Sequence, residues 1–445
     1  MGRRAHRTTV INTTLQKGRK STQRERLLAG MITAANRHGY AGANVSAVIS
    51  EARVSRPTFY DYFADRDDCF LAAVAEVESR LLADVEGSLH EEPPQRAVLA
   101  SVRALVGFAG REPAMARFLT NEPMAGGLMA LDARDRGITA IAKLIQKRQR
   151  DVDSAALVPD FSSRILIGGI YRLLAARLRR GEPKLSQLIP DLVGWVAAYG
   201  VPAAQHRWDA LKAVPSPPSS PFVPESSLRA PDRLPLGRIS LSEEDVAENQ
   251  RLRIMFAAAH LAQDKGYDAT TIGDIIKVAG VDVRVFYAMF ADKQEAFMAV
   301  HELGFQRVMD VTASAFFSGS TWPERNWEAG RAFTQFLENN PLVANVGFVE
   351  AYAVGPGAVQ RVEDSHAAFA MLLQEGYQHV PADAQPSRLV LEAIITTIFE
   401  TVYSRVRASG KPRLPGLVPH LTFLVLAPFL GADEANRFID GKLAK

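Results

Sequence analysis

Cysteine, long apolar runs and catalytic signatures are all scarce in this chain of 445 residues. The single cysteine, Cys69, excludes an intrachain disulfide framework and a cysteine-based zinc site, and it fits a reducing, cytoplasmic compartment. No run of about 18 uninterrupted apolar residues occurs, so we expect no membrane-spanning helix. The P-loop, the dinucleotide fingerprint, the HExxH signature and the nucleophile elbow are missing as well. The sequence therefore predicts no enzyme, no metal site and no cofactor.

What the chain does contain is an ordinary 47% of hydrophobic residues, at a length beyond that at which single cores stop growing. We therefore expect two domains. The net charge is only +3, but residues 1–26 hold eight Lys and Arg side chains against one acid, Glu25. Such an arm is attracted to phosphates, although a solvated tail would have the same composition.

A proline-rich stretch, residues 201–238, divides the chain almost in half. It contains eight prolines and several serines and lacks apolar periodicity. This composition predicts a linker that is semi-rigid and extended where the prolines cluster.

The two halves show an internal repeat. A shift of 227 residues aligns residues 24–73 with 251–300 without a gap, and about 15 of the 50 positions are identical. A shift of 229 later pairs residues 181–190 with 410–419 at Gly, Pro and Leu positions. The duplication therefore covers whole units.

Apolar residues recur at helical spacing nearly throughout, and no alternating β pattern competes. Thr22 with Glu25, and Ser242 with Asp245, are capping-box signals at the starts of two helices. The sequence predicts an all-α fold of two tandem units, each a three-helix head with a helical-bundle body. The expected parts are a basic arm (1–20), head 1 (21–73), body 1 (74–200), the linker (201–238), head 2 (239–300) and body 2 (301–445).

Residues 45–63 have the pattern of a helix-turn-helix. Val45–Ala52 predicts a short helix, Arg53-Val54-Ser55 the turn, and Arg56–Phe63 the second helix. Ser55 is a natural N-cap, and Pro57 is tolerated in the first helical turn because its missing N–H needs no intrahelical partner. The second helix of such a pair can enter the major groove of DNA. Beyond it, Asp65 predicts the cap of a third helix, with Asp68 completing a capping box.

This segment resembles the TetR family, whose pattern is a Gly-Tyr loop, an Ala-Gly-Val-Ser turn, a Thr-Leu/Phe-Tyr-x-x-Phe recognition helix and a following Asp/Asn-Lys. The resemblance covers about 50 residues in each half and the bodies only loosely. Two departures are Arg53 in place of the turn glycine, which costs roughly 1 kcal/mol if that residue is left-handed, and Asn44 in place of a capping Thr.

The resemblance implies a role for each residue of the first recognition helix. Phe59 and Phe63 would hold the helix on its core. Arg56, Pro57 and Thr58 would face base edges, while Tyr60 and Arg66 would bind phosphate. Tyr60 could instead be a core side chain.

The second head has the turn Gly280-Val281-Asp282 and the helix Val283–Phe290. Val283 and Val285 replace the polar residues expected to face bases. The residues left as phosphate or guanine contacts are Arg284, Tyr287 and Lys293. Phe286 and Phe290 match the buried pair of the first head.

The sequence thus predicts an effector-responsive DNA-binding regulator, by resemblance a repressor, whose partners are a double-stranded operator and a small-molecule effector. In the alternative, only head 1 binds DNA and the second unit is a sensor or dimerisation module. The apolar helices expected in residues 161–178, 185–199, 389–406 and 417–430 are natural pairing surfaces. They allow an intramolecular pseudo-dimer or a homodimer of chains. Trp195, Trp322 and Trp327 either line an effector cavity or fill the bundle.

Overall fold

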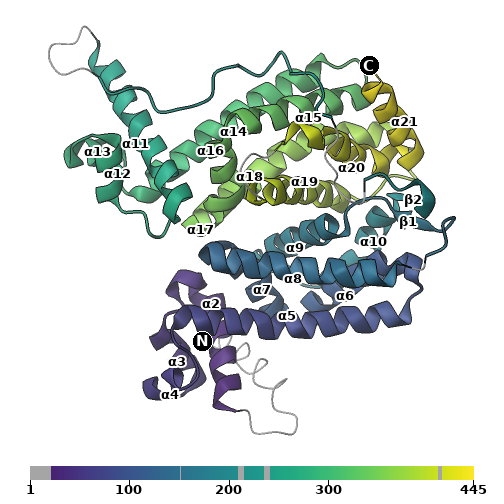
Figure 1. Cartoon of the computed structure of the whole chain (residues 1–445), viewed down its shortest axis with the longest axis horizontal. Coiled ribbons are helices and arrows are strands. Elements are labelled where there is room, and N and C mark those ends of the chain that lie inside the picture. The colour runs from purple at the N-terminus through teal and green to yellow at the C-terminus, as the bar shows by residue number, and fades with distance from the viewer. Residues whose placement is uncertain (1–21, 151, 209–214, 235–240, 409–412, 445) are drawn as a thin grey trace. The chain divides into compact units, whose positions relative to one another are not determined.

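The computed structural model describes residues 22–150, 152–208, 215–234, 241–408 and 413–444 (Figure 1). The basic arm predicted at residues 1–20 lies outside them. The first repeat contains the helices α2 (Gln23–Gly42), α3 (Val45–Ala52), α4 (Arg56–Tyr60), α5 (Arg66–Glu91), α6 (Ala97–Arg111), α7 (Pro113–Ala125), α8 (Gly127–Arg148), α9 (Ser163–Arg179) and α10 (Ile189–Ala197). The second contains α11 (Glu243–Lys265), α12 (Ile272–Ala279), α13 (Val283–Met289), α14 (Lys293–Ser318), α15 (Trp322–Asn339), α16 (Pro341–Asn345), α17 (Ala351–Val354), α18 (Pro356–Leu373), α19 (Leu389–Arg407), α20 (Val418–Leu430) and α21 (Ala432–Leu443).

The all-α prediction is confirmed, with one small exception. β1 (Leu157–Pro159) and β2 (Gly200–Pro202) pair antiparallel through Val158 and Val201. Three-residue strands are too short to give an alternating pattern, so the sequence carried no signal for them. No described helix is long and apolar enough to cross a membrane.

The chain forms two compact units whose boundary does not follow the linker. Unit 1 takes residues 1–152 and 170–193, and unit 2 takes 153–169 and 194–445. Unit 2 therefore includes two segments of the first repeat besides the whole second repeat.

Unit 1 begins with the helix-turn-helix head, in which α2 packs on α3 and α5. The predicted capping box at its start is present, because Thr22 Oγ1 accepts from Glu25 N and the Glu25 carboxylate accepts from Thr22 N. α5 then continues into the body, where it packs against α6 and α8. Asp65 caps α5 as predicted, but Asp68 accepts from Ala64 N and not from the N-cap backbone.

Unit 2 repeats this plan with α11–α13 as its head and α14 running into its body. The predicted capping box of Ser242 and Asp245 is present at the start of α11. In the body, α14 lies along α15, and α15 packs on α20 (Figure 1). A π-helical turn, Val346–Glu350, interrupts the helical run between α16 and α17. The head and body are thus joined by one long helix, as in unit 1.

The first-repeat segments of unit 2 pack on the last helices of the second repeat. Trp195 Nε1 donates to Tyr199 Oη, and that hydroxyl donates to the Leu424 carbonyl of α20 at 2.9 Å. On α9, a Cβ at Gly169 would overlap the side chain of Thr397 on α19. The absence of a side chain at Gly169 therefore lets these two helices approach closely.

The predicted linker is ordered along its described length. Its first residues form β2, and Trp208 is 3% exposed, with Nε1 bonded to Asn436 Oδ1 at 2.8 Å. Residues 215–234 have no helix or strand but lie against unit 2 through hydrogen bonds described below. This stretch is a docked segment and not a free tether.

Candidate nucleic-acid interface

Each head holds its helix-turn-helix with an arginine from its first helix. Arg26 Nη2 donates to the carbonyls of Ala52 and Arg53 at 2.6 and 2.5 Å. Arg253 Nη2 makes the same pair of contacts, to Ala279 and Gly280. The last carbonyls of a helix have no intrahelical donor, so each guanidinium satisfies groups that would otherwise be orphaned. The sequence reasoning missed this role, although the identity of Arg26 and Arg253 in the repeat was its signal.

The turns of the two heads share a left-handed residue. Arg53 has φ 53° and ψ 51°, and Gly280 has φ 62° and ψ 45°. Glycine reaches this conformation without steric cost, whereas a side chain is strained there by roughly 1 kcal/mol. The first head therefore has a cationic side chain at its turn and bears the strain of the left-handed conformation. The second head has no such strain, because its turn residue is glycine.

Side-chain caps begin each recognition helix. Ser55 Oγ accepts from Thr58 N at 3.3 Å, and Asp282 Oδ1 accepts from Arg284 N at 2.8 Å. α4 ends at Tyr60 and is shorter than predicted, although the Phe63 amide still donates to the Phe59 carbonyl at 3.0 Å. The caps fix the direction in which the exposed first turn points.

Two phenylalanines seat each recognition helix on its head. Phe59 and Phe63 are 0% and 4% exposed, and Phe286 and Phe290 are 0% and 2% exposed. The rings of each pair lie 5.8 and 6.1 Å apart, centroid to centroid. Burial of both rings leaves the opposite face of each helix turned to solvent.

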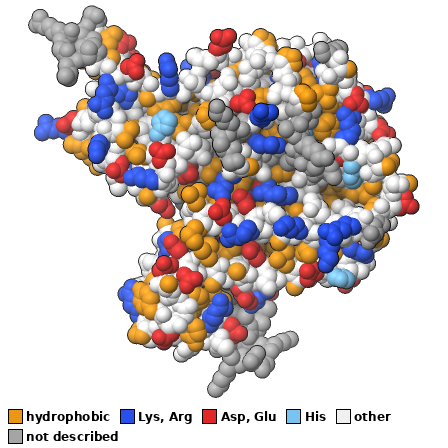
Figure 2. Space-filling view, in the orientation of Figure 1, with side chains coloured by type: hydrophobic (Ala, Val, Ile, Leu, Met, Phe, Trp, Pro, Cys, Tyr) orange, Lys and Arg blue, Asp and Glu red, His pale blue; other side chains and the backbone are white. Residues whose placement is uncertain are grey.

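That outer face carries the residues predicted to meet DNA. Tyr60 is 51% exposed and Tyr287 is 56% exposed, which decides against a core role for Tyr60. Arg56, Pro57 and Arg284 are also exposed, whereas Thr58 is half-buried and bonds Ser55 Oγ through its hydroxyl. Figure 2 shows Lys and Arg side chains over the lobe of α11–α13, mixed with exposed hydrophobic ones. Val278 and Val283 of this head are exposed hydrophobic residues, at 52% and 44%.

The profile of bacterial regulatory proteins of the tetR family matches residues 27–73 and 254–300, the two heads. The chain belongs to the TetR family. It is thus a DNA-binding transcription regulator of a family that is not one of enzymes. A comparison with curated proteins gave no match.

Solved structures similar to this TetR-family chain cover about one repeat. The fatty acid degradation regulator FadR from Bacillus halodurans has 13% identity and a TM-score of 0.34, covering 39% of this chain and 97% of its own. FadR from Bacillus subtilis, in complex with stearoyl-CoA, has 13% identity and a TM-score of 0.33 over the same shares. A TetR-like regulator from Rhodococcus sp. RHA1 has 18% identity and a TM-score of 0.29, covering 39% of this chain and 95% of its own.

Two residues predicted to bind phosphate are held inside the heads of this TetR-family chain. Arg66 donates to Tyr40 Oη at 2.9 Å and to Asp67 Oδ1 at 2.7 Å. Lys293 Nζ donates to the carbonyls of Tyr267, Asp268 and Thr270 at 3.0, 3.3 and 3.0 Å. An ammonium group has three donors, so this one is fully satisfied without DNA.

The body of unit 2 has a half-open cavity of about 70 Å³ between α14, α15, α18, α19 and α20. On the same measure a single water needs about 10–15 Å³. Most of the lining is apolar, including Phe316, Phe333 and Phe399. Its polar members include the hydroxyls of Thr312 and Thr422, which are buried and have no hydrogen-bond partner among the described residues. Trp195, Trp322 and Trp327 are buried in unit 2 and are not among its lining residues.

Proposed function

We propose that this chain is an effector-responsive repressor that presents two non-identical heads to one operator. The observation that carries the proposal is the exposed first turn of each recognition helix, seated on two buried phenylalanines. Arg56, Pro57 and Thr58 are assigned to base edges in one half-site and Arg284 to the other, while Tyr60 and Tyr287 bind phosphates.

Arg66 and Lys293 contribute to the same interface indirectly, because they hold parts of each head in place. Each ties the loop before the helix-turn-helix to the start of the long helix that leads into the body. A shift of that helix would therefore move the loop with it. Direct phosphate binding by these two side chains is the alternative role.

The effector is proposed to bind in the cavity of unit 2. The apolar lining and the two unpaired hydroxyls favour a mostly apolar molecule with one or two hydrogen-bonding groups. α14 both lines this cavity and begins at the head of unit 2, so it is the element that can couple the two sites. Binding would then change the spacing of the heads.

Pairing within one chain is proposed to replace the usual homodimer. A shift of 228 residues makes Gly169 of α9 and Thr397 of α19 equivalent, and the two residues face each other. Self-matching contacts of this kind are the mark of a two-fold arrangement. The close approach of Gly169 to Thr397 within unit 2 supports such pairing.

A second candidate function keeps DNA binding in head 1 alone. The exposed Val278 and Val283 favour it, because apolar side chains gain nothing from phosphates. In this case the second unit acts as the sensor.

Selection of bound duplexes from a random DNA pool tests these proposals, with light scattering at low concentration beside it. We expect one chain per complex and an asymmetric site with two different half-sites, about one helical turn apart. Arg284→Ala should change the sequence selected in one half only. A palindrome bound by two chains contradicts the pseudo-dimer, and a single selected half-site supports the second candidate.

A further inference from the structure

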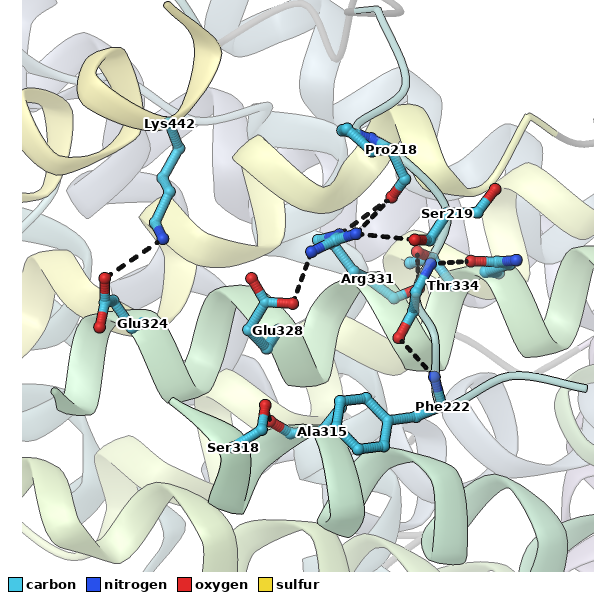
Figure 3. A network of polar contacts seen from close by, with 12 residues as sticks. Pro218, Ser219, Phe222, Ala315, Ser318, Glu324, Glu328, Arg331, Thr334 and Lys442 are labelled. Atoms are coloured by element: carbon cyan, nitrogen blue, oxygen red, sulfur yellow. Dashed lines mark hydrogen bonds and ion pairs between the residues drawn. The ribbon is translucent and has the colours of Figure 1, made fainter. Parts of the chain in front are cut away.

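Residues 215–234, which we call the strap, are fastened to the body of unit 2 by side chains of α15. Arg331 donates to the carbonyls of Pro218 and Ser219 at 2.7 and 2.9 Å and is itself held by Glu328 at 2.6 Å (Figure 3). Gln335 Oε1 accepts from Ser220 N at 2.6 Å. These bonds satisfy backbone groups that have no partner in a helix or strand.

The far end of the strap is fastened to the end of α15 in the body and then to the head of unit 2. Asn340 Oδ1 accepts from Leu228 N at 2.6 Å, and Asn249 Nδ2 of α11 donates to the Asp232 carbonyl at 3.1 Å. Leu228 and Ala230 pack against the apolar core of this head. The strap is therefore part of the head's structure, and its last described residues have a defined place.

That place is the turn of the helix-turn-helix. A Cβ at Gly280 would overlap the guanidinium of Arg233, so the arginine of the strap lies directly on the glycine. Arg233 is also close enough to Arg253 to join burial in lowering the pKa of that side chain. Within the described residues Arg233 is exposed and has no carboxylate partner.

The repeat gives this position a counterpart. The shift of 227 residues makes Gly280 equivalent to Arg53, the left-handed arginine of the first head. Head 1 thus carries a guanidinium on its turn, and head 2 has a glycine there that leaves room for a guanidinium from the strap. Both heads thus have an arginine at the turn, in head 1 as the turn residue itself and in head 2 from the strap.

We infer that Arg233 is a phosphate-binding residue of head 2, supplied by the strap to replace Arg53 of head 1. The inference rests on the proposal that head 2 binds DNA. Two neighbouring arginines without a counter-charge repel each other, and a phosphate at the turn relieves that repulsion. The strap then positions the cation, with Arg331 and Asn249 as its anchors.

The test measures binding of the full chain to a random-sequence DNA duplex across a range of salt concentrations. Loss of one phosphate contact flattens the slope of log K against log salt by about 0.9 and weakens binding roughly 8-fold at 0.1 M salt. We expect this result for Arg233→Ala. Arg229→Ala removes the same charge from the strap and should change the slope little.

A rescue variant tests whether a cation at the turn is sufficient, whichever segment of the chain supplies it. Arg233→Ala combined with Gly280→Arg returns a guanidinium to the turn, in a conformation that Arg53 already adopts, and should restore the slope. Thermal unfolding of each variant checks that the head remains folded. An unchanged slope for Arg233→Ala, an equal loss for Arg229→Ala, or no rescue would overturn the inference.

A double variant, Arg284→Ala with Tyr287→Phe, distinguishes failure of the Arg233 inference from failure of the proposed function. If that pair flattens the slope and Arg233→Ala does not, head 2 binds DNA and only the inference falls. If the pair has no effect either, head 2 does not bind DNA and both fall together.

Discussion

Lys293 donates to the carbonyl oxygen of Tyr267 at 3.0 Å, and its ammonium group stands 4.4 Å from the centre of the same residue's ring. Two more carbonyls of the same loop take its other donors. The start of α14 is thereby tied to the loop that precedes α12.

Lys293→Met should loosen this loop. Hydrogen bonds from a charged donor contribute about 1.5–3 kcal/mol, so we expect head 2 to lose roughly 2 kcal/mol of unfolding free energy. Hydrogen exchange at residues 267–270 should rise. Lys277→Met, which removes the same charge from an exposed site on α12, is the control. Weaker DNA binding with unchanged exchange would instead mean that Lys293 binds phosphate directly.

Arg56→Ala and Tyr60→Phe should have different effects on DNA recognition. A base-edge contact carries roughly 1–3 kcal/mol of discrimination, so Arg56→Ala should relax sequence preference in one half-site. Tyr60→Phe keeps the ring and removes the hydroxyl, and it should weaken binding to all sequences alike. Affinities for a selected site and a scrambled one give the measurement. Equal loss of specificity in both variants would contradict the assignment.

Arg53→Gly should stabilise head 1 and weaken its DNA binding at the same time. The left-handed φ of 53° favours glycine by roughly 1 kcal/mol, which denaturant unfolding would report. Loss of the turn cation should reduce affinity for random-sequence DNA. Gly280→Ala is the reverse control, because it adds strain and a clash in head 2. A fall in stability for Arg53→Gly would refute the strain argument.

Thr422→Val should stabilise the protein in the absence of any ligand. The change keeps the shape of the side chain and removes a buried hydroxyl that has no partner, which costs about 1–3 kcal/mol. Thr312→Val should act in the same direction. Thr334→Val is the matched control, because the Thr334 hydroxyl donates to the Gly330 carbonyl at 2.7 Å and its loss should destabilise. A destabilising Thr422→Val would show that this hydroxyl is satisfied.

Glu78→Gln should change how stability depends on pH. Burial raises the pKa of Glu78 from 4.5 to about 7, so the folded state resists loss of this proton. Its contribution is fully present below pH 4.5 and is lost as the pH rises through 7. The neutral variant escapes that loss, and it should gain about 3 kcal/mol over the natural chain at pH 8 but little at pH 4.5. Parallel pH profiles of unfolding free energy would contradict this.

The heads could be predicted from sequence because their determinants are local. N-caps such as Ser55 and Asp65 bond to amides three residues away, and the two phenylalanines of each pair are four residues apart. The repeat adds a second, independent copy of each signal. The left-handed backbone conformation of Arg53 could also be predicted, because Arg53 stands where the TetR pattern has its turn glycine.

The docking of the strap on unit 2 could not be predicted in this way. The same is true of the hydrogen bonds by which Arg26 and Arg253 hold the turns of the two heads. The strap is held by Gln335 and Asn340, more than 100 residues away in the chain, so only the tertiary fold brings them together. Its proline content predicts an extended chain, but composition does not reveal what such a chain lies against. The role of Lys293 was likewise hidden, because its acceptors are backbone carbonyls that every residue possesses.

The pairing of Gly169 with Thr397 has a consequence for how the two copies diverge. In a symmetric homodimer a residue on the axis meets its own copy, so glycine would leave a void and threonine would overlap itself. A duplicated chain can place the small residue opposite the larger one, and each helix then fits its sister better than itself. In the proposed pseudo-dimer, such a contact would favour pairing of the two repeats over pairing with a second copy of either one. Each repeat would then be free to diverge in the DNA sequence and the ligand that it binds.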